Sequence, residues 1–457
     1  MKFNSTFRNF GVALAGLACV FLYAPKGAAQ QNFSEVKPSA QQVTWQDMEF
    51  GVLIHFGTNT YLDKEVGEGN ADPKVFNPVD FDADQWMKAI KASGAKYVVL
   101  VAKHHDGFCL WPSDGTDYSV KSSPWKNGKG DVVREVSDAA RKNGLKFGVY
   151  LSPYDRHDKR YSGDPAAYDN YYLGQVDELA GNYGELAEFW MDGAGSGGHP
   201  YDFSRIIQEL RIRQPNTMVF ADTQLFQYAD IRWVGNEDGN ADYENWNVVD
   251  RTGYLRWRPA EADTALKHGH WFWHTDSDSS VKTLSELVDE YNHTIGKGAQ
   301  LMLGVAPDPT GRVPEVDAAR LKEFGDAIRK LYGHNLVQEQ KGTGPAHAAL
   351  DGNPDTFWSA PVGSHSAVIE VTFPKPVTFD RTLAMEWLNE GQHVQKYAIE
   401  VEDHGTWKTV AEGQAIGHKK IDIFSPVTAQ KVRLNLLSTT SEAHIREFQI
   451  FNGSTAE

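Results

Sequence analysis

The run Tyr97-Val98-Val99-Leu100-Val101 is apolar throughout and is followed closely by two adjacent histidines, His104 and His105. A short, uninterrupted apolar run of this kind is typical of a strand that is buried on both faces, as in a parallel sheet. An amphipathic stretch, Val132–Lys142, comes next, and then a second apolar run, Lys146–Leu151. This order predicts a βαβ unit with polar side chains at the end of its first strand.

The same alternation extends from about Phe50 to His334. The predicted strands are residues 51–55, 97–101, 146–151, 188–191, 218–220, 231–234, 271–273 and 300–303. The predicted helices include 84–93, 132–142, 172–180, 203–213 and 284–294. Eight strands alternating with helices predict an α/β fold. The pattern fits a (β/α)8 TIM-like barrel better than it fits an open doubly wound sheet. No glycine-rich dinucleotide fingerprint follows the first strand, which argues against a Rossmann fold.

The character of the sequence changes after Asn335. Residues 336–345 are polar and rich in turn formers, which indicates a linker. Short alternating runs follow at 367–373, 397–401, 432–436 and 448–451, without a helical pattern between them. They predict that residues 346–457 form an antiparallel β-sandwich of the jelly-roll type, and that the barrel occupies residues 30–335.

The first 29 residues have the pattern of a signal peptide. Lys2 and Arg8 precede an apolar stretch, 11–24, and small residues end at Ala29. We therefore expect export to the periplasm or the cell exterior, and no later run is long enough to predict a membrane span. Cleavage would leave Cys109 as the single cysteine, so no intrachain disulfide could form.

The formal net charge is −16, which argues against nucleic acid or an anionic membrane as the partner. The chain also holds 13 Trp and 18 Tyr. Such rings stack on the apolar face of sugars, although a large core also buries many aromatic residues.

Catalytic residues of TIM barrels lie at the carboxyl ends of the strands. In this sequence those ends carry His55, His104, His105, Tyr154, Asp192, Glu237, Trp273 and His274. Asp192 closes the run Glu188–Met191 and is followed by a glycine-rich segment that leaves space around it, although an isolated Asp-Gly more often starts a turn. Glycoside hydrolysis generally needs two carboxyl groups, and Glu237 is the candidate for the second. If Glu237 is partly buried beside ionised Asp192, its pKa should rise; the alternative is a solvated loop carboxylate.

Four motifs, His55-Phe56-Gly57, Lys103–Phe108, Tyr150–Pro153 and Trp190–Gly193, together resemble glycoside hydrolase family 29, the α-L-fucosidases. Residues 303–311 add to the resemblance, which spans about Trp45 to Tyr332. It implies a retaining exo-α-L-fucosidase that acts on fucosylated glycans with Asp192 as nucleophile. The segment around Glu237 is similar to the acid/base motif of the subfamily that acts on α-1,3/1,4-fucosyl branches, which implies that Glu237 is the acid/base.

The resemblance also implies a set of sugar contacts and requires no metal or other cofactor for catalysis. The implied contacts are His55, Glu65, His104, His105, Tyr154, Trp190 and Trp273, the last with Trp271 beside it. Relatives usually read Glu-Trp-Gly where this chain has Glu65-Val66-Gly67, and Leu-Asn-Val where it has Leu303-Gly304-Val305. Val66 has no indole donor, so a hydroxyl contact is missing or is provided elsewhere.

The C-terminal segments Ala349–Trp358 and Ile445–Phe448 resemble discoidin-like, or family 32 carbohydrate-binding, modules. Such modules often hold Ca²⁺ near the first segment, because Asp and main-chain oxygens suit a hard cation. We expect this module to brace the barrel rather than to act as a lectin.

Three other hypotheses remain beside the fucosidase. One is a glycan-binding protein that has lost activity, and another is an exo-glycosidase acting on a related 6-deoxy sugar or L-galactoside. The third is a metal-dependent hydrolase using His55, His104, His105 and Asp106. Adjacent histidines on a strand would point to opposite faces, which disfavours a shared metal. The sequence leaves the linkage, the aglycone and the oligomeric state open.

Overall fold

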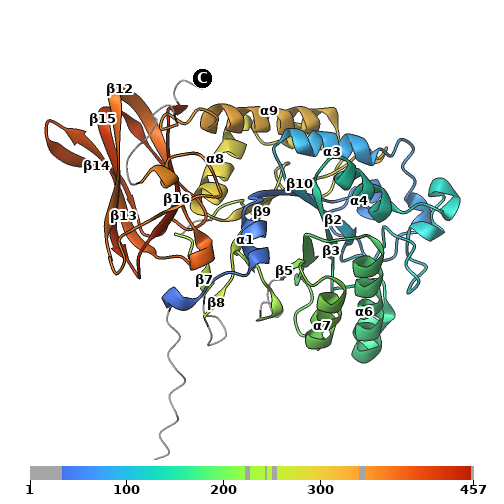
Figure 1. The fold of residues 1–457 in the computed structure, drawn as a ribbon. Helices are drawn as coiled ribbons and strands as arrows, with labels where there is room; N and C mark the ends of the chain where they lie inside the picture. Colours follow the sequence, from blue (N-terminus) through green and yellow to red (C-terminus); the bar gives the residue numbers. More distant parts are fainter. Residues whose placement is uncertain (1–32, 222–226, 242–243, 250–254, 339–345, 454–457) are drawn as a thin grey trace, which may run out of the picture.

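A computed structural model of the chain describes residues 33–221, 227–241, 244–249, 255–338 and 346–453. Its centre is a parallel sheet of eight strands (Figure 1). In sheet order these are β5 (Met218–Ala221), β4 (Glu188–Met191), β3 (Lys146–Leu151), β2 (Tyr97–Lys103), β1 (Phe50–Ile54), β10 (Gln300–Val305), β9 (Ala260–Ala265) and β6 (Arg232–Trp233). A parallel bridge between Phe220 and Ile231 brings the two edges together. The predicted TIM-like barrel is confirmed.

Alternation along each strand divides the core of the barrel into two layers. On β2, Val98 and Leu100 pack outward with helix residues such as Trp86. Tyr97 and Val99 point inward and join a second cluster. Trp190 belongs to this inner cluster, so the same face of β4 leads to Asp192 two residues on. The inner layer closes the barrel below the site.

The seventh strand differs from the prediction. Residues 271–273 were expected to form it, but they lie in a bend, and the strand is β9, with the sequence Ala-Glu-Ala-Asp-Thr-Ala. Glu261 and Asp263 point into the barrel and are almost fully buried. The apolar pattern that marks a buried strand is absent here because these acidic residues occupy inward positions.

Nine α-helices are described along the chain. They are α1 (Ala40–Gln46), α2 (Thr58–Leu62), α3 (Ala83–Ala92), α4 (Val132–Lys142), α5 (Lys159–Gly163), α6 (Pro165–Asn182), α7 (Phe203–Arg213), α8 (Leu284–Thr294) and α9 (Glu315–Tyr332). Several begin at an N-cap whose side chain accepts a main-chain N–H, including Asp82, Asp131, Asp164, Asp202 and Thr283. These caps satisfy donors of the first turn that have no partner within the helix. All five predicted helices are present.

The C-terminal unit is an antiparallel six-stranded β-sandwich, as predicted. Its strands are β11 (Trp358–Ser359), β12 (Ala367–Glu386), β13 (Val394–Asp403), β14 (Thr406–Gly413), β15 (Lys420–Thr439) and β16 (His444–Phe451), in the order β11-β16-β12-β15-β13-β14. Shifts in register along the pair β12–β15 allow these long strands to bend around their own core. A small pair, β7 (Val248–Val249) and β8 (Arg256–Trp257), lies in the barrel domain. Most of the predicted linker, residues 339–345, lies outside the described residues.

The sandwich lies against one side of the barrel, near α8 and α9 (Figure 1). Polar contacts cross the interface: Lys420 pairs with Glu244 at 2.7 Å, and Asn247 donates to Gln392 at 3.0 Å. Burial alone would raise the pKa of Glu49, but Lys419, together with His418, lowers it to about 2. These contacts agree with the expectation that the sandwich braces the barrel.

Within the described part of the chain, no helix combines the length and the apolar character needed to cross a membrane. The predicted signal peptide, residues 1–29, lies outside that part.

Candidate active site

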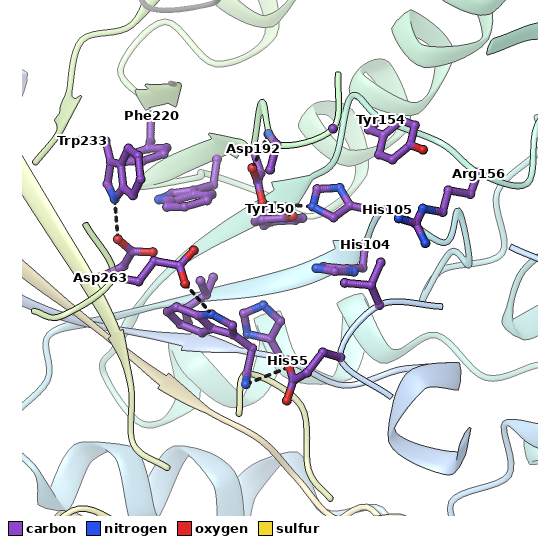
Figure 2. Close-up of a pocket in the computed structure, with 18 residues that line it drawn as sticks. His55, His104, His105, Tyr150, Tyr154, Arg156, Asp192, Phe220, Trp233 and Asp263 are labelled. Atoms are coloured by element: carbon purple, nitrogen blue, oxygen red, sulfur yellow. Dashed lines mark hydrogen bonds and ion pairs between the residues drawn. The ribbon is translucent and has the colours of Figure 1, made fainter. Parts of the chain in front are cut away.

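A cavity of about 380 Å³ opens at the carboxyl ends of the barrel strands (Figure 2). It is lined by Leu53, His55, Glu65, Val66, His104, His105, Tyr150, Tyr154, Arg156, Trp190, Asp192, Ala194, Gly195, Phe220, Trp233, Glu237, Asp263 and Trp271. Asp192 and Glu237, the two candidate catalytic carboxyls, therefore share one cavity. Of the seven predicted sugar contacts, six line it and Trp273 does not.

Asp192 follows the last residue of β4 and accepts hydrogen bonds on both of its oxygens. The Tyr150 hydroxyl donates to Oδ2 at 2.7 Å, and the Ala194 N–H donates to Oδ1 at 2.8 Å. His105 Nε2 lies 3.3 Å from Oδ2. Burial acts to raise the pKa of Asp192, but the hydrogen bond and charge of His105, together with the hydrogen bonds from the Ala194 N–H and the Tyr150 hydroxyl, outweigh it and lower the pKa. The site thus holds an ionised carboxylate at the floor of the cavity.

The adjacent histidines both line the cavity, which corrects the expectation that they point apart. They follow the end of β2, so strand alternation no longer applies to them. His105 Nδ1 lies 2.7 Å from Ser152 Oγ, which fixes the ring toward Asp192. Burial lowers the pKa of His104 well below its usual value and that of His55 to about 3. Both rings are therefore neutral at pH 7 and offer polar atoms without a charge.

Glu65 holds the segment that follows β9 against the cavity wall. Its Oε2 accepts the main-chain N–H groups of Trp271 and Phe272, at 3.0 and 3.3 Å. Its Oε1 lies 3.1 Å from His270 Nδ1 and 2.7 Å from His274 Nε2. Glu65, His270 and His274 are the one group of metal-binding residue types that the described residues bring within ligand distance, and hydrogen bonds already account for their arrangement. The four residues of the metal-hydrolase hypothesis form no such group there.

Trp271 lines the cavity, whereas Trp273 does not. The Trp271 ring lines the cavity, and its Nε1 donates to Glu237 Oε2 at 3.2 Å. Trp273 lies two residues further along a bend and is not part of the cavity wall. The expected position of Trp273 depended on the misplaced seventh strand, because Trp273 was treated as a strand end.

Glu237 lies in the loop after β6 and its side chain is exposed. Of the two alternatives for this side chain, partial burial and a solvated loop position, the structure shows the solvated one. The carboxylate nevertheless contributes to the cavity wall, where the Trp271 indole holds it. Its exposed position is suited to the mouth of the site, where a leaving group would depart.

Trp190 and Tyr154 form two further parts of the wall. The Trp190 indole stacks on Phe220 with ring centres 3.7 Å apart, and its Nε1 donates to buried Glu261 at 2.7 Å. The Tyr154 ring lies 5.7 Å from that of His105. Aromatic faces therefore border the cavity on more than one side.

Sequence reasoning did not assign a site role to Tyr150, Arg156, Trp233 or Asp263. The sequence could have identified Tyr150 as a site residue, because it lies in the predicted strand 146–151 and on the face of that strand that points into the barrel. Asp263 could not be found, because its strand was not recognised. Burial raises the pKa of Asp263 well above its usual value, although its Oδ1 accepts a 2.6 Å hydrogen bond from Trp233 Nε1.

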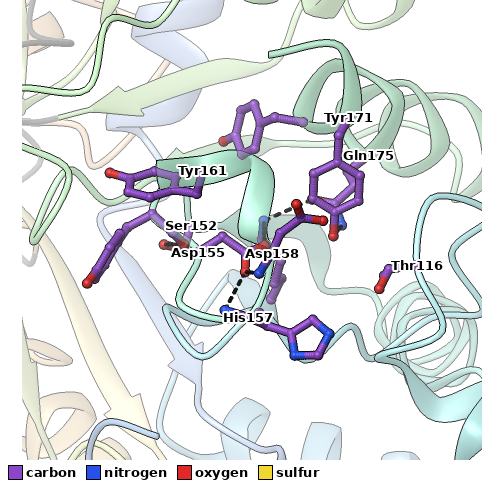
Figure 3. A network of polar contacts seen from close by, with 12 residues as sticks. Thr116, Ser152, Asp155, His157, Asp158, Tyr161, Tyr171 and Gln175 are labelled. Atoms are coloured by element: carbon purple, nitrogen blue, oxygen red, sulfur yellow. Dashed lines mark hydrogen bonds and ion pairs between the residues drawn. The ribbon is translucent and has the colours of Figure 1, made fainter. Parts of the chain in front are cut away.

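A buried ion pair supports the loop that carries Tyr154 and Arg156 (Figure 3). Lys103 Nζ lies 3.1 Å from Asp155 Oδ2 and donates to Gln175 Oε1 at 2.9 Å. The other oxygen of Asp155 accepts the N–H groups of His157 and Asp158, each at 2.9 Å. Both members of the pair are essentially inaccessible to solvent. The network fixes the main chain after β3, and with it one side of the cavity.

In the C-terminal unit, an oxygen-rich loop suits a calcium ion. Thr356 Oγ1 lies 2.9 and 3.0 Å from the carboxylate oxygens of Asp351 and 3.0 Å from the main-chain oxygen of Asn353. On β16, Glu447 Oε1 is buried without a hydrogen-bond partner among the described residues. Burial, with the nearby charge of Asp351, raises the pKa of Glu447 to about 7. A hard cation would satisfy this oxygen, so the residues present fit Ca²⁺.

A barrel with an ionised carboxylate at its floor, a second carboxylate in the same cavity and aromatic walls defines a glycoside hydrolase site. The family model described as "Alpha-L-fucosidase" matches residues 60–331, and the model described as "F5/8 type C domain" matches residues 335–448. The chain belongs to the α-L-fucosidase family, glycoside hydrolase family 29, and carries a C-terminal discoidin-like domain.

Similar proteins agree with this assignment. Alpha-L-fucosidase 1 of Arabidopsis thaliana is 35% identical over 418 residues, which cover 84% of this chain and 81% of that protein. The crystal structure of a putative alpha-L-fucosidase from Bacteroides thetaiotaomicron matches with a TM-score of 0.86 and 34% identity, over 91% of this chain and 98% of the other. A Ruminococcus gnavus GH29 fucosidase in complex with fucose matches with a TM-score of 0.84 and 30% identity, over 92% and 95%.

Proposed function

We propose that this α-L-fucosidase releases terminal L-fucose with retention, using Asp192 as nucleophile and Glu237 as acid/base. The observation that carries the proposal is the environment of Asp192. The Tyr150 hydroxyl, the Ala194 N–H and the His105 ring surround one carboxylate whose pKa is lowered, at the floor of a cavity that Glu237 also lines. A nucleophile must be ionised and held in place, and these contacts favour both.

In the first step, an Asp192 oxygen bonds to the anomeric carbon while the bond to the leaving oxygen breaks. Glu237 in its protonated form gives its proton to that oxygen. In the second step, Glu237 accepts a proton from water as the water oxygen bonds to the anomeric carbon, and Asp192 leaves as carboxylate. Two displacements on one carbon restore the original configuration.

The neutral rings of His55 and His104 would donate to and accept from fucose hydroxyls without altering the charge at Asp192. Glu65, His105 and Tyr154 would provide further polar contacts. Trp190 and Trp271 would provide apolar faces, which suit the sugar ring and its methyl group. Trp271 replaces Trp273 in this role.

Two variants test the proposed chemistry. Asp192→Ala should abolish hydrolysis of an aryl fucoside, and near-normal turnover would remove Asp192 as nucleophile. Glu237→Ala should be slow on natural linkages but should recover rate on activated fucosides when azide is added. NMR of the first-formed anomer would decide between retention and inversion.

We further propose that the preferred linkage is α-1,3 or α-1,4, on the basis of the segment around Glu237. The test is a panel of defined oligosaccharides that contains Lewis-type trisaccharides, α-1,2-linked fucosides and an L-galactoside. Preferential cleavage of the Lewis-type substrates supports the proposal. Faster cleavage of α-1,2-linked fucosides or of the L-galactoside would contradict it.

Two features outside the site are also proposals. Asp351, Thr356 and Glu447 would hold a Ca²⁺ ion that ties the first loop of the sandwich to β16. The N-terminal pattern supports export through a signal peptide cleaved after residue 29, to the periplasm or beyond. Mass spectrometry of the mature N-terminus would test the second proposal, and retention of residues 1–29 would overturn it.

A further inference from the structure

Arg156 is the single lysine or arginine among the described residues that line the active-site cavity. Its side chain is 32% exposed. A guanidinium group remains positively charged in proteins and donates through five N–H groups that lie in one plane. A few polar groups placed in this way usually fix the orientation of a ligand in its cavity. Neither step of the proposed mechanism gives Arg156 a role.

The main chain holds Arg156 close to the contacts of the nucleophile. Its N–H donates to the main-chain oxygen of His105 at 2.9 Å, and His105 Nε2 lies 3.3 Å from Asp192. The preceding residue, Asp155, belongs to the buried ion pair with Lys103. The side chain of Arg156 therefore extends from a rigid point, as a residue that must hold a ligand precisely should.

One contact orients the guanidinium group and leaves other donors free. Nη1 donates to the main-chain oxygen of Gly67 at 3.2 Å. Glu68 Oε2 lies 3.7 Å from the same nitrogen, but the Glu68 side chain is 62% exposed, so water screens this ion pair. Nε and Nη2 of Arg156 form no hydrogen bond with the residues that the structure describes. The N–H groups of these two nitrogens are therefore available to a ligand.

Val66 and His104 line the cavity with Arg156. Val66 comes directly before Gly67, is 38% exposed and has no polar atom in its side chain. Burial is the largest cause of the lowered pKa of His104, and the charge of Arg156 acts in the same direction. The histidine is thus neutral and the valine is apolar. A sugar hydroxyl in this part of the cavity would find its charged donor in Arg156.

Arg156 lies across the cavity from the proposed acid/base. Figure 2 shows Trp233 and Asp263 on the opposite side of the cavity from Arg156. Glu237 belongs to that opposite side, because its loop follows β6, the strand of Trp233. A fucose with its anomeric carbon at Asp192 and its leaving oxygen at Glu237 would therefore turn the far edge of its ring toward Arg156. That edge carries the hydroxyls at C-3 and C-4.

We propose that Arg156 determines specificity by donating hydrogen bonds to the hydroxyls at C-3 and C-4 of fucose. These hydroxyls are cis on neighbouring carbons, so one planar guanidinium group can reach both oxygens, as it reaches both oxygens of a carboxylate. The inference rests on the proposed roles of Asp192 and Glu237 and adds to them the recognition of the far edge of the sugar. It defines the substrate as a terminal fucose with both hydroxyls unsubstituted.

The test compares Arg156→Met with the wild-type protein on three aryl α-L-fucosides: the parent compound, its 3-deoxy analogue and its 4-deoxy analogue. On the parent compound, kcat/KM should fall by roughly 10- to 100-fold, as expected when hydrogen bonds from a charged donor are lost. On each analogue the loss should be at least about threefold smaller, because one of the two bonds is already absent. The ratio of variant to wild type cancels any effect of deoxygenation on the intrinsic reactivity of the substrate.

His157→Phe is the matched control. His157 Nδ1 donates to the main-chain oxygen of Gly69 at 2.7 Å, so it joins the same two loops as Arg156 does, but it is not part of the cavity wall. Phenylalanine keeps a ring to stack on Tyr118 and removes the donor. Any loss of kcat/KM in this variant should be by the same factor on all three substrates.

Arg156→Lys keeps the charge but loses the planar fork, so it should retain only part of the wild-type rate on the parent fucoside. It also provides the same comparison of substrates if Arg156→Met does not fold. Equal losses on all three substrates would mean that Arg156 only holds the Gly67 loop, and they would overturn the inference. A near-normal kcat/KM on the parent compound would overturn it as well.

Asp192→Ala separates this inference from the proposed function. If the wild-type protein releases no fucose, or if Asp192→Ala hydrolyses the parent fucoside at a near-normal rate, the proposed function fails. If Asp192→Ala is inactive but the Arg156 variants lose the same factor on all three substrates, only the present inference fails.

Discussion

The Tyr150 hydroxyl lies 2.7 Å from Asp192 Oδ2 and donates a hydrogen bond to it. Tyr150 belongs to β3 and Asp192 follows β4, so the contact joins neighbouring strands across the floor of the cavity. The bond favours the ionised form of Asp192, because a carboxylate accepts it more strongly than a neutral acid does. It also fixes the direction of the oxygen that would attack the sugar.

Replacing Tyr150 with Phe should therefore raise the pKa of Asp192. The sign follows from the direction of the shift: the pKa of Asp192 is lowered in the folded protein, and loss of a donor allows it to rise. The acidic limb of kcat/KM should move to higher pH, and the rate at pH 7 should fall by roughly 10- to 100-fold, the equivalent of a hydrogen bond to a charged group. A pH–rate profile on an aryl fucoside measures both, and an unmoved acidic limb would contradict this role.

Replacing Lys103 with Met should destabilise the protein and loosen the loop after β3. The change leaves Asp155 buried without its cation, which costs roughly 3–5 kcal/mol in the free energy of unfolding. Urea denaturation measures the loss. In the double variant Lys103→Met/Asp155→Asn the uncompensated charge is gone, so part of the stability should return; a double variant no more stable than the single one would count against the ion pair.

Replacing Trp271 with Phe should reduce kcat/KM on oligosaccharides, because the cavity loses aromatic surface and Glu237 loses its indole donor. Trp273→Phe is the matched control, since that ring lies outside the cavity wall, and its effect should be much smaller. Kinetics of the two purified variants under identical conditions decide the question. A larger loss from Trp273→Phe would restore the assignment made from the sequence.

Removing calcium should lower the thermal midpoint of the full chain. An ion bound at Asp351 and Glu447 in the folded state alone would add about 2.7 kcal/mol when present at a hundred times its Kd. Differential scanning fluorimetry with a chelator, with and without added Ca²⁺, measures the change. Glu447→Gln should remove most of the response to Ca²⁺. A thermal midpoint that changes neither with the chelator nor with added Ca²⁺ would contradict the proposed calcium site.

Much of this protein follows from local sequence. Apolar runs such as Tyr97–Val101 and amphipathic stretches such as Val132–Lys142 form the strands and helices that their periodicity predicts, because burial of one face or of both is a local property of the pattern. The position of Asp192 also follows from the sequence. Side chains alternate along β4, so Asp192, two residues after the inward-facing Trp190, points to the same face.

The other features of the site could be assigned only from the closed barrel. Glu261 and Asp263 are acidic residues in a buried strand, and only the surrounding strands show that their positions point inward. Trp271, and not Trp273, reaches the cavity. The reason is that Glu65, some 200 residues earlier in the chain, accepts hydrogen bonds from the main-chain N–H groups of Trp271 and Phe272 and so holds this bend in place. Periodicity reports the face that a residue occupies on its own element, whereas neighbours that meet only in three dimensions determine where a loop turns and which carboxyl groups lie together.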